Sequence, residues 1–94
     1  MNHQPLVSII MNCHNGEKYI AEAIDSVLEQ TYSNWELIIW DNCSTDSTAL
    51  ISKSYNDKRI KYFLSEKFKK LGEARNLAIQ NTSGDFIGFL EDKN

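Results

Sequence analysis

Four short apolar runs, separated by stretches with helical spacing, set the pattern of this chain. The runs occupy residues 7–11, 35–40, 60–64 and 86–90. Their β-branched and aromatic content predicts four strands, and the first run reads as a buried one. Each strand before the last is followed by a polar segment and then by a helix-like stretch.

Apolar residues in these intervening stretches recur at three- and four-residue steps, which predicts three helices. From the first helix to the third, these positions are Ile20, Ile24, Val27 and Leu28; Leu50, Ile51 and Tyr55; and Ala74, Leu77 and Ala78. Thr45 or Asp46 is the expected cap of the second helix. Residues 65–71 are basic and predicted to form a loop. The order β-α-β-α-β-α-β predicts an α/β fold with a mainly parallel, Rossmann-like sheet of about four strands and flanking helices.

Composition supports a globular chain and excludes several classes. The 94 residues are 41% hydrophobic and 24% charged, with a net charge of −3, which argues against a nucleic-acid partner. No apolar run approaches the roughly 20 residues that a membrane span needs. The first residues lack the basic and apolar regions of a signal peptide, so we expect a cytoplasmic protein.

Charge is distributed unevenly along the chain. Residues 1–47 carry seven acidic groups and one basic group, whereas residues 48–94 carry six acidic and nine basic groups. The basic second half suits an anionic ligand, but ordinary solvated surface is the preferred explanation for most of its lysines.

Cys13 and Cys43 are too few for a disulfide framework and are expected to be reduced thiols. A zinc site that combines both with His14 is the alternative. The paired Cys-x-x-Cys spacing of such sites is missing, however.

Polar clusters follow three of the predicted strands, at residues 12–15, 41–46 and 91–94. Parallel strands place their carboxyl ends on one rim of the sheet, where open α/β folds bind ligands. Glycine-rich dinucleotide and P-loop motifs are absent, as is a Gly-x-Ser-x-Gly elbow. The sequence therefore predicts a ligand site at this rim that belongs to none of those classes.

Several segments, in order, resemble the motifs of family 2 glycosyltransferases with the GT-A fold. They are VSIIMNCHNG at 7–16, the helix end before Gln30-Thr31-Tyr32, ELIIWDNCSTDST at 36–48, GEARN at 72–76 and GDFIGFL at 84–90. The resemblance covers nearly the whole chain. It implies that residues 1–94 form the nucleotide-diphospho-sugar-binding part of a longer glycosyltransferase, truncated after an Asp-x-Asp-like loop.

The resemblance also implies roles for particular residues. Those expected to bind the nucleotide, with a UDP-sugar favoured, are Asn12, His14, Asp41, Asn42 and Arg75. Asn42 stands where the family has a second acid, and an amide accepts hydrogen bonds without the assistance of charge. Arg75 is expected either to contact the diphosphate or to form a structural ion pair.

The metal-binding motif of the family becomes Glu91-Asp92-Lys93 here. Two hypotheses follow. Either Glu91 and Asp92 bind a divalent cation, Mn²⁺ or Mg²⁺, or Lys93 itself compensates the charge of the diphosphate.

The family's general base lies in the carboxyl-terminal half, beyond Asn94, so no catalytic residue is expected within this chain and the 94 residues alone should not transfer sugar. A full-length enzyme would be cytoplasmic or membrane-peripheral. Apolar surface left by the truncated sheet predicts self-association. A degenerate module that binds a nucleotide or a partner without catalysis is the alternative function, and a receiver-like or flavodoxin-like domain is a third.

Overall fold

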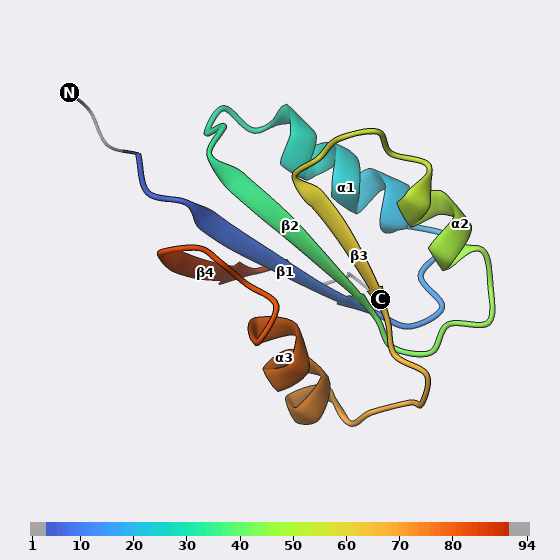
Figure 1. The fold of residues 1–94 in the computed structure, drawn as a ribbon. Coiled ribbons are helices and arrows are strands. Elements are labelled where there is room, and N and C mark those ends of the chain that lie inside the picture. Colours follow the sequence, from blue (N-terminus) through green and yellow to red (C-terminus); the bar gives the residue numbers. More distant parts are fainter. Residues whose placement is uncertain (1–3, 91–94) are drawn as a thin grey trace.

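The computed structural model describes residues 4–90, and in them seven elements alternate along the chain (Figure 1). They are β1 (Val7–Cys13), α1 (Ile20–Glu29), β2 (Trp35–Asp41), α2 (Thr48–Lys53), β3 (Ile60–Leu64), α3 (Leu71–Ile79) and β4 (Phe86–Phe89). The strands form one parallel sheet in the order β3-β2-β1-β4. The predicted α/β fold and element order are confirmed.

The helices lie on both faces of the sheet (Figure 1). Helices α1 and α2 cover one face, over a core that includes Met11, Leu37 and Trp35; α3 covers the other, where Ala74 and Ala78 are buried. None of these helices, within the described part of the chain, combines the length and apolarity needed to cross a membrane.

Trp35 and Trp40 belong to different faces of β2. Trp35 packs in the α1–α2 core and Trp40 in the α3 core. Successive side chains of a strand point to opposite faces, so the odd separation of these two residues predicts this arrangement, and the structure confirms it.

Two strands run further than their apolar runs indicate. β1 extends to Cys13 and β2 to Asp41, because these residues are paired in the parallel register that joins the two strands. Pairing across the sheet thus draws the polar residues Asn12 and Asp41 into strands. The polar cluster at the rim begins on rigid backbone rather than in a loop.

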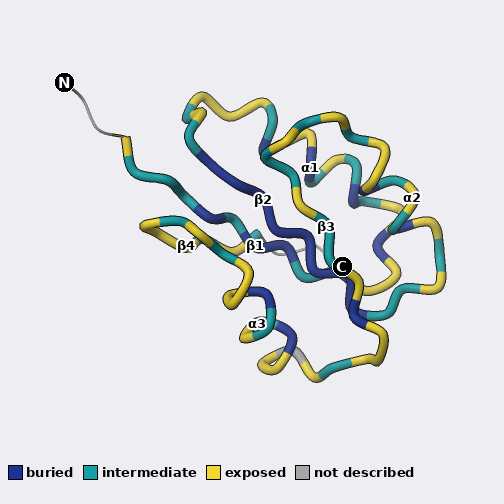
Figure 2. The backbone as a smooth tube through the Cα atoms, viewed as in Figure 1, coloured by how far each residue is buried: buried dark blue, intermediate teal, exposed yellow. Residues whose placement is uncertain are grey.

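Burial differs sharply between the centre and one edge of the sheet (Figure 2). All seven residues of β2 are buried. At the β4 edge, by contrast, Phe86, Ile87 and Phe89 are 60%, 43% and 47% exposed. An apolar strand edge with this much exposure is a surface that favours association.

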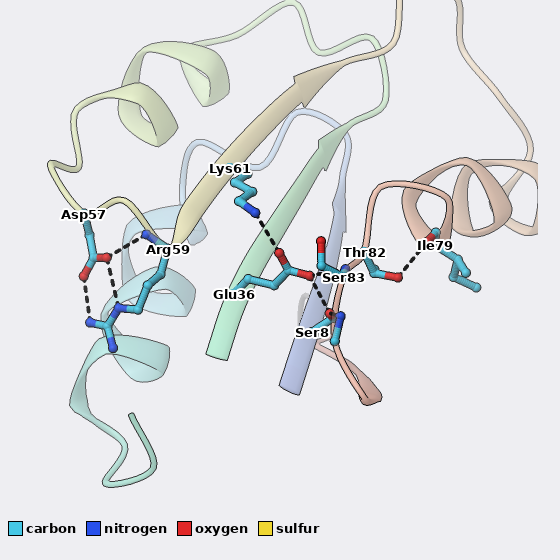
Figure 3. A network of polar contacts seen from close by, with 9 residues as sticks. Ser8, Glu36, Asp57, Arg59, Lys61, Ile79, Thr82 and Ser83 are labelled. Atoms are coloured by element: carbon cyan, nitrogen blue, oxygen red, sulfur yellow. Dashed lines mark hydrogen bonds and ion pairs between the residues drawn. The ribbon is translucent and has the colours of Figure 1, made fainter. Parts of the chain in front are cut away.

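A buried carboxylate ties the amino-terminal end of the sheet together (Figure 3). Glu36 accepts hydrogen bonds from Lys61 at 2.8 Å, from the Ser8 hydroxyl at 2.5 Å and from the Ser83 backbone N–H at 2.5 Å. Burial raises the pKa of Glu36, but these hydrogen bonds more than offset it, and the pKa lies below its usual 4.5. The network fixes the turn before β4 to β1, β2 and β3, at the end of the sheet opposite the polar rim.

Candidate functional site

The loops that follow β1 and β2 are joined by hydrogen bonds into one platform at the carboxyl ends of these strands. The Asn42 N–H donates to the Cys13 carbonyl at 2.7 Å, and the Asn15 N–H donates to the Ser44 hydroxyl at 2.8 Å. The Asn15 side-chain oxygen accepts from the Thr45 N–H at 2.8 Å. Backbone and short side chains thus hold the two loops in fixed relation.

The platform continues to the start of α2. Glu17 and Asp46 exchange contacts: the Glu17 N–H donates to Asp46 at 3.1 Å, and Glu17 accepts from the Ser47 N–H at 2.9 Å. Asp46 also accepts from the Thr48 N–H at 2.9 Å. The N-cap of α2 is Ser47, whose side chain makes no capping hydrogen bond, so neither Thr45 nor Asp46 is the cap that the sequence predicted. Asp46 instead satisfies the Thr48 amide from the residue before the cap.

Two residues of the platform adopt left-handed backbone conformations. Asn15 has a φ of 52° and Cys43 a φ of 62°. Asparagine tolerates this region, whereas cysteine occupies it at a cost in strain.

Asp41 lies beneath the platform and is fully buried. One carboxylate oxygen accepts the Tyr62 hydroxyl at 2.5 Å, and the other accepts the Ser44 N–H at 3.0 Å. Burial, together with the hydrogen bond to Asp41, raises the pKa of the Tyr62 phenol above its usual 10.0. In this conformation Asp41 orients the backbone at Ser44 rather than presenting its own oxygens at the surface.

Asn42 is also buried, and its side chain pairs with the backbone of the segment between β3 and α3. The amide oxygen accepts the Lys69 N–H at 2.8 Å, and the amide nitrogen donates to the Lys69 carbonyl at 2.8 Å. The sequence predicted Asn42 as a direct nucleotide ligand. In the structure its amide holds the segment between β3 and α3 against the platform.

His14 is exposed at the rim and is oriented from two sides. Its Nδ1 lies 2.6 Å from the Asn42 carbonyl oxygen, which can only accept, so Nδ1 carries a proton. Its ring meets the Phe68 ring edge-on, with centroids 5.0 Å apart, and Phe68 is 62% exposed. The two rings form an exposed aromatic pair.

Phe68 was missed by the sequence reasoning, which described residues 65–71 only as a basic loop. One signal was available: Phe68 is the single aromatic residue in that loop, which also contains three lysines. Tyr62 was missed as well, because an alternating strand gives no reason to single out a tyrosine on its buried face.

Asn12 and Trp40 leave a buried acceptor and a buried donor on the α3 face. Their Cα atoms are register partners on β1 and β2, and among residues 4–90 neither Asn12 Oδ1 nor Trp40 Nε1 has a hydrogen-bond partner. Buried polar atoms without partners are uncommon and mark places where water or a ligand completes the structure. This pair lies near the carboxyl ends of both strands.

Arg75 extends the site toward β4. Its guanidinium lies 5.4 Å from the centre of the Phe89 ring, at the carboxyl end of β4. The Leu90 N–H donates to the Ile10 carbonyl at 2.8 Å, so the chain leaves β4 beside β1. Glu91, Asp92 and Lys93 lie outside the described residues.

The described residues contain no group of three or more histidine, cysteine or acidic side chains that could hold a metal ion. Cys13 is buried with its sulfur 3.6 Å from the Trp40 carbonyl, and the Cys43 sulfur lies 3.7 Å from the Glu66 carbonyl. Within the described residues neither cysteine forms a disulfide. The alternative of a zinc site on these cysteines and His14 is therefore not supported.

Comparison with known proteins agrees with this geometry. A sequence model described as "Glycosyl transferase family 2" matches residues 8–92. The chain belongs to glycosyl transferase family 2. The resemblance identified from the sequence motifs is confirmed.

Curated relatives within glycosyl transferase family 2 are close in sequence but much longer. The chain is 46% identical over 86 residues to the Escherichia coli UDP-Glc:alpha-D-GlcNAc-diphosphoundecaprenol beta-1,3-glucosyltransferase WfgD, covering 92% of the chain and 34% of that protein. It is 42% identical over 90 residues to the putative glycosyltransferase EpsE of Bacillus subtilis, covering 93% of the chain and 32% of EpsE. The chain thus spans about a third of the length of these relatives.

Solved structures show the same fold. The S. aureus TarS 1–349 structure in complex with UDP has a TM-score of 0.85 and 32% identity, covering 90% of this chain and 26% of that one. Glucosyl-3-phosphoglycerate synthase from Mycobacterium tuberculosis, solved with Mn²⁺, UDP and glucosyl-3-phosphoglycerate, has a TM-score of 0.72 and 28% identity, covering 93% and 33%. The GT-A fold predicted from the sequence is confirmed.

Proposed function

We propose that this chain is the nucleotide-sugar-binding part of a family 2 glycosyltransferase that uses a UDP-sugar. The carrying observation is the exposed aromatic pair at the rim, in which His14 of the platform meets Phe68 of the segment between β3 and α3. UDP in the TarS and glucosyl-3-phosphoglycerate synthase structures, and UDP-Glc in the name of WfgD, support this donor class.

The site residues divide by exposure. His14 and Phe68 would pack against the base, because aromatic rings offer area at low entropic cost and stack on any base. The buried Asp41 and Asn42 would support this surface from beneath. Asn12 Oδ1, which has no hydrogen-bond partner among the described residues, would accept an N–H or O–H group of the nucleoside. Arg75, near the end of β4, would face the diphosphate.

Charge on the leaving nucleoside diphosphate is the main chemical demand of the reaction. An acceptor hydroxyl would attack the anomeric carbon in line, forming the new C–O bond as the sugar–phosphate bond breaks and giving inversion. Its proton would pass to a general base beyond Asn94. A divalent cation held by Glu91 and Asp92, whose oxygen donors suit Mn²⁺ or Mg²⁺, would neutralise the developing negative charge.

Whether a divalent cation or Lys93 compensates the charge of the diphosphate can be tested directly. Titration calorimetry of UDP with and without Mn²⁺, on the wild type and on Asp92→Ala, separates the two hypotheses. Binding that requires Mn²⁺ and is lost in Asp92→Ala supports the cation. Equal binding without Mn²⁺, weakened by Lys93→Ala, supports direct compensation by the lysine instead.

We further propose a role in cell-envelope polysaccharide synthesis, in the cytoplasm and peripheral to the membrane in a full-length protein. WfgD supports this, because its name gives an acceptor linked to undecaprenol, a long lipid.

A thermal-shift and calorimetry panel of UDP, GDP, ADP and their sugars tests the function. We expect saturable binding of UDP and UDP-sugars and no sugar transfer by the 94 residues. Absence of any nucleotide binding would contradict the proposal. Transfer by this chain would show that the base lies within it.

A further inference from the structure

Asn42 connects three segments that are far apart in the sequence. Its backbone N–H donates to Cys13, its carbonyl accepts from His14, and its side chain makes two hydrogen bonds to Lys69. The residue is 7% exposed. All four of its polar groups are therefore engaged with the protein, on the loop after β1 and on the β3–α3 segment.

The pairing with Lys69 requires an amide. The same side chain accepts from the Lys69 N–H and donates to the Lys69 carbonyl, each at 2.8 Å. A carboxylate has acceptors only, so it would face the Lys69 carbonyl with a negative charge. The family pattern has an acid at this position, and this chain has the one residue of similar size that closes both hydrogen bonds.

The segment that Asn42 holds carries the exposed aromatic ring of the site. Phe68 immediately precedes Lys69 and rests on His14. Two other contacts lie before it: the Ser65 N–H donates to the Asp41 carbonyl at 2.8 Å, and the Cys43 thiol lies 3.7 Å from the Glu66 carbonyl. The two hydrogen bonds between Asn42 and Lys69 thus hold the segment at the residue that directly follows Phe68.

We propose that Asn42 is a positioning residue whose amide, by pairing with the Lys69 backbone, fixes Phe68 against His14 and thereby sets the affinity for the nucleotide base. This rests on the proposed nucleotide-binding function. It assigns Asn42 an indirect role, through the β3–α3 segment, rather than a contact with the ligand.

Asn42→Asp tests the amide, because the substitution keeps the shape and, at pH 7, replaces the donor with a negatively charged acceptor. At pH 7 we expect about tenfold weaker UDP binding in calorimetry, with the affinity for inorganic pyrophosphate unchanged. The amide exchange of Lys69 should accelerate, and the His14 ring-proton resonances should lose the ring-current shift from Phe68. Asn34→Asp is the matched control: Asn34 also donates to a backbone carbonyl, that of Gln4, but at the other end of β2.

Lowering the pH should restore the pairing with the Lys69 backbone in Asn42→Asp but not in Asn42→Ala. A protonated carboxyl has one O–H donor and one acceptor oxygen, as the amide does. At about pH 4 its neutral form can again pair with Lys69, whereas Asn42→Ala cannot recover at any pH. The titratable side chains of His14, Asp41, Glu66 and Lys69 also belong to the residues around this pairing. They are common to the wild type, which serves as the reference at each pH.

The outcomes separate the two proposals. Wild-type protein that binds no UDP contradicts the proposed function. The amide exchange of Lys69 and the ring-proton shifts of His14 still test whether Asn42 holds Phe68 against His14. Wild-type UDP affinity in Asn42→Asp, or identical behaviour of Asn42→Asp and Asn42→Ala across pH, overturns the positioning role. If both variants fail to fold, an unprotected Lys69 amide in the wild type overturns it, and a protected one supports it.

Discussion

The hydroxyl of Tyr62 on β3 donates to the carboxylate of Asp41 on β2 at 2.5 Å, beneath the rim of the sheet. Asp41 is fully buried, and its second oxygen accepts the Ser44 N–H. A strand side chain therefore fixes the carboxylate that in turn shapes the loop carrying the site. This relationship couples the stability of the sheet to the geometry of the rim.

Tyr62→Phe should destabilise the protein by about 1–3 kcal/mol, because it leaves a buried charged acceptor without its donor. Urea denaturation measures this. Tyr55→Phe is the control, since the Tyr55 hydroxyl donates to the exposed Asp25, which water can solvate, and it should cost less. Equal costs in the two variants would show that the buried hydrogen bond carries no special weight.

The raised pKa of Tyr62 also predicts behaviour in alkali. The folded state keeps the phenol protonated at pH values where the unfolded chain has lost the proton. Stability from this group is therefore complete below about pH 10 and falls as the pH rises above it. Tyr62→Phe should flatten this alkaline loss, and an unchanged slope would contradict the assignment.

Glu36→Gln should destabilise by about 1.5–3 kcal/mol at pH 7, because three donors converge on a charged, buried acceptor. The pKa of Glu36 is lowered from its ordinary value of 4.5, so its contribution is present above that pH and is lost as the pH falls through the folded-state pKa. The variant should therefore show a shallower acid transition. Glu73→Gln, which breaks only the surface contact of Glu73 with Lys69 at 3.6 Å, is the control with little expected effect.

Gly84→Ala should destabilise by about 1–3 kcal/mol through overpacking. A Cβ at Gly84 would lie 2.4 Å from the Ser8 hydroxyl oxygen and 2.8 Å from the Leu6 carbonyl oxygen, whereas one at Gly88 would meet nothing within 4 Å. Gly88→Ala is thus the matched control. Thermal unfolding of both variants checks the prediction, which fails if their midpoints fall equally.

The β4 edge should mediate self-association of this chain with a second copy. Sedimentation velocity should show concentration-dependent dimers or larger species that Ile87→Lys or Phe89→Lys reduces, since a charge on an apolar edge opposes pairing. Leu50→Lys, at a residue 75% exposed on α2, controls for charge alone. A monomer at all concentrations would contradict the prediction.

The sequence by itself determined the element order, the parallel α/β sheet, the opposite faces of Trp35 and Trp40, and the family. Those features follow from local periodicity and from motifs contained in short segments. The rim as the place where the polar clusters meet was also predictable, because parallel strands end on one side.

Only the tertiary structure decided what individual residues do at that rim. The Asn42 amide pairs with Lys69, 27 residues away in the chain, and Phe68 reaches His14 from the same segment. Such contacts depend on how loops meet after the sheet has formed. No spacing in the sequence encodes them, and neither the buried state of Asp41 nor the left-handed backbone of Cys43 can be read from residue type alone.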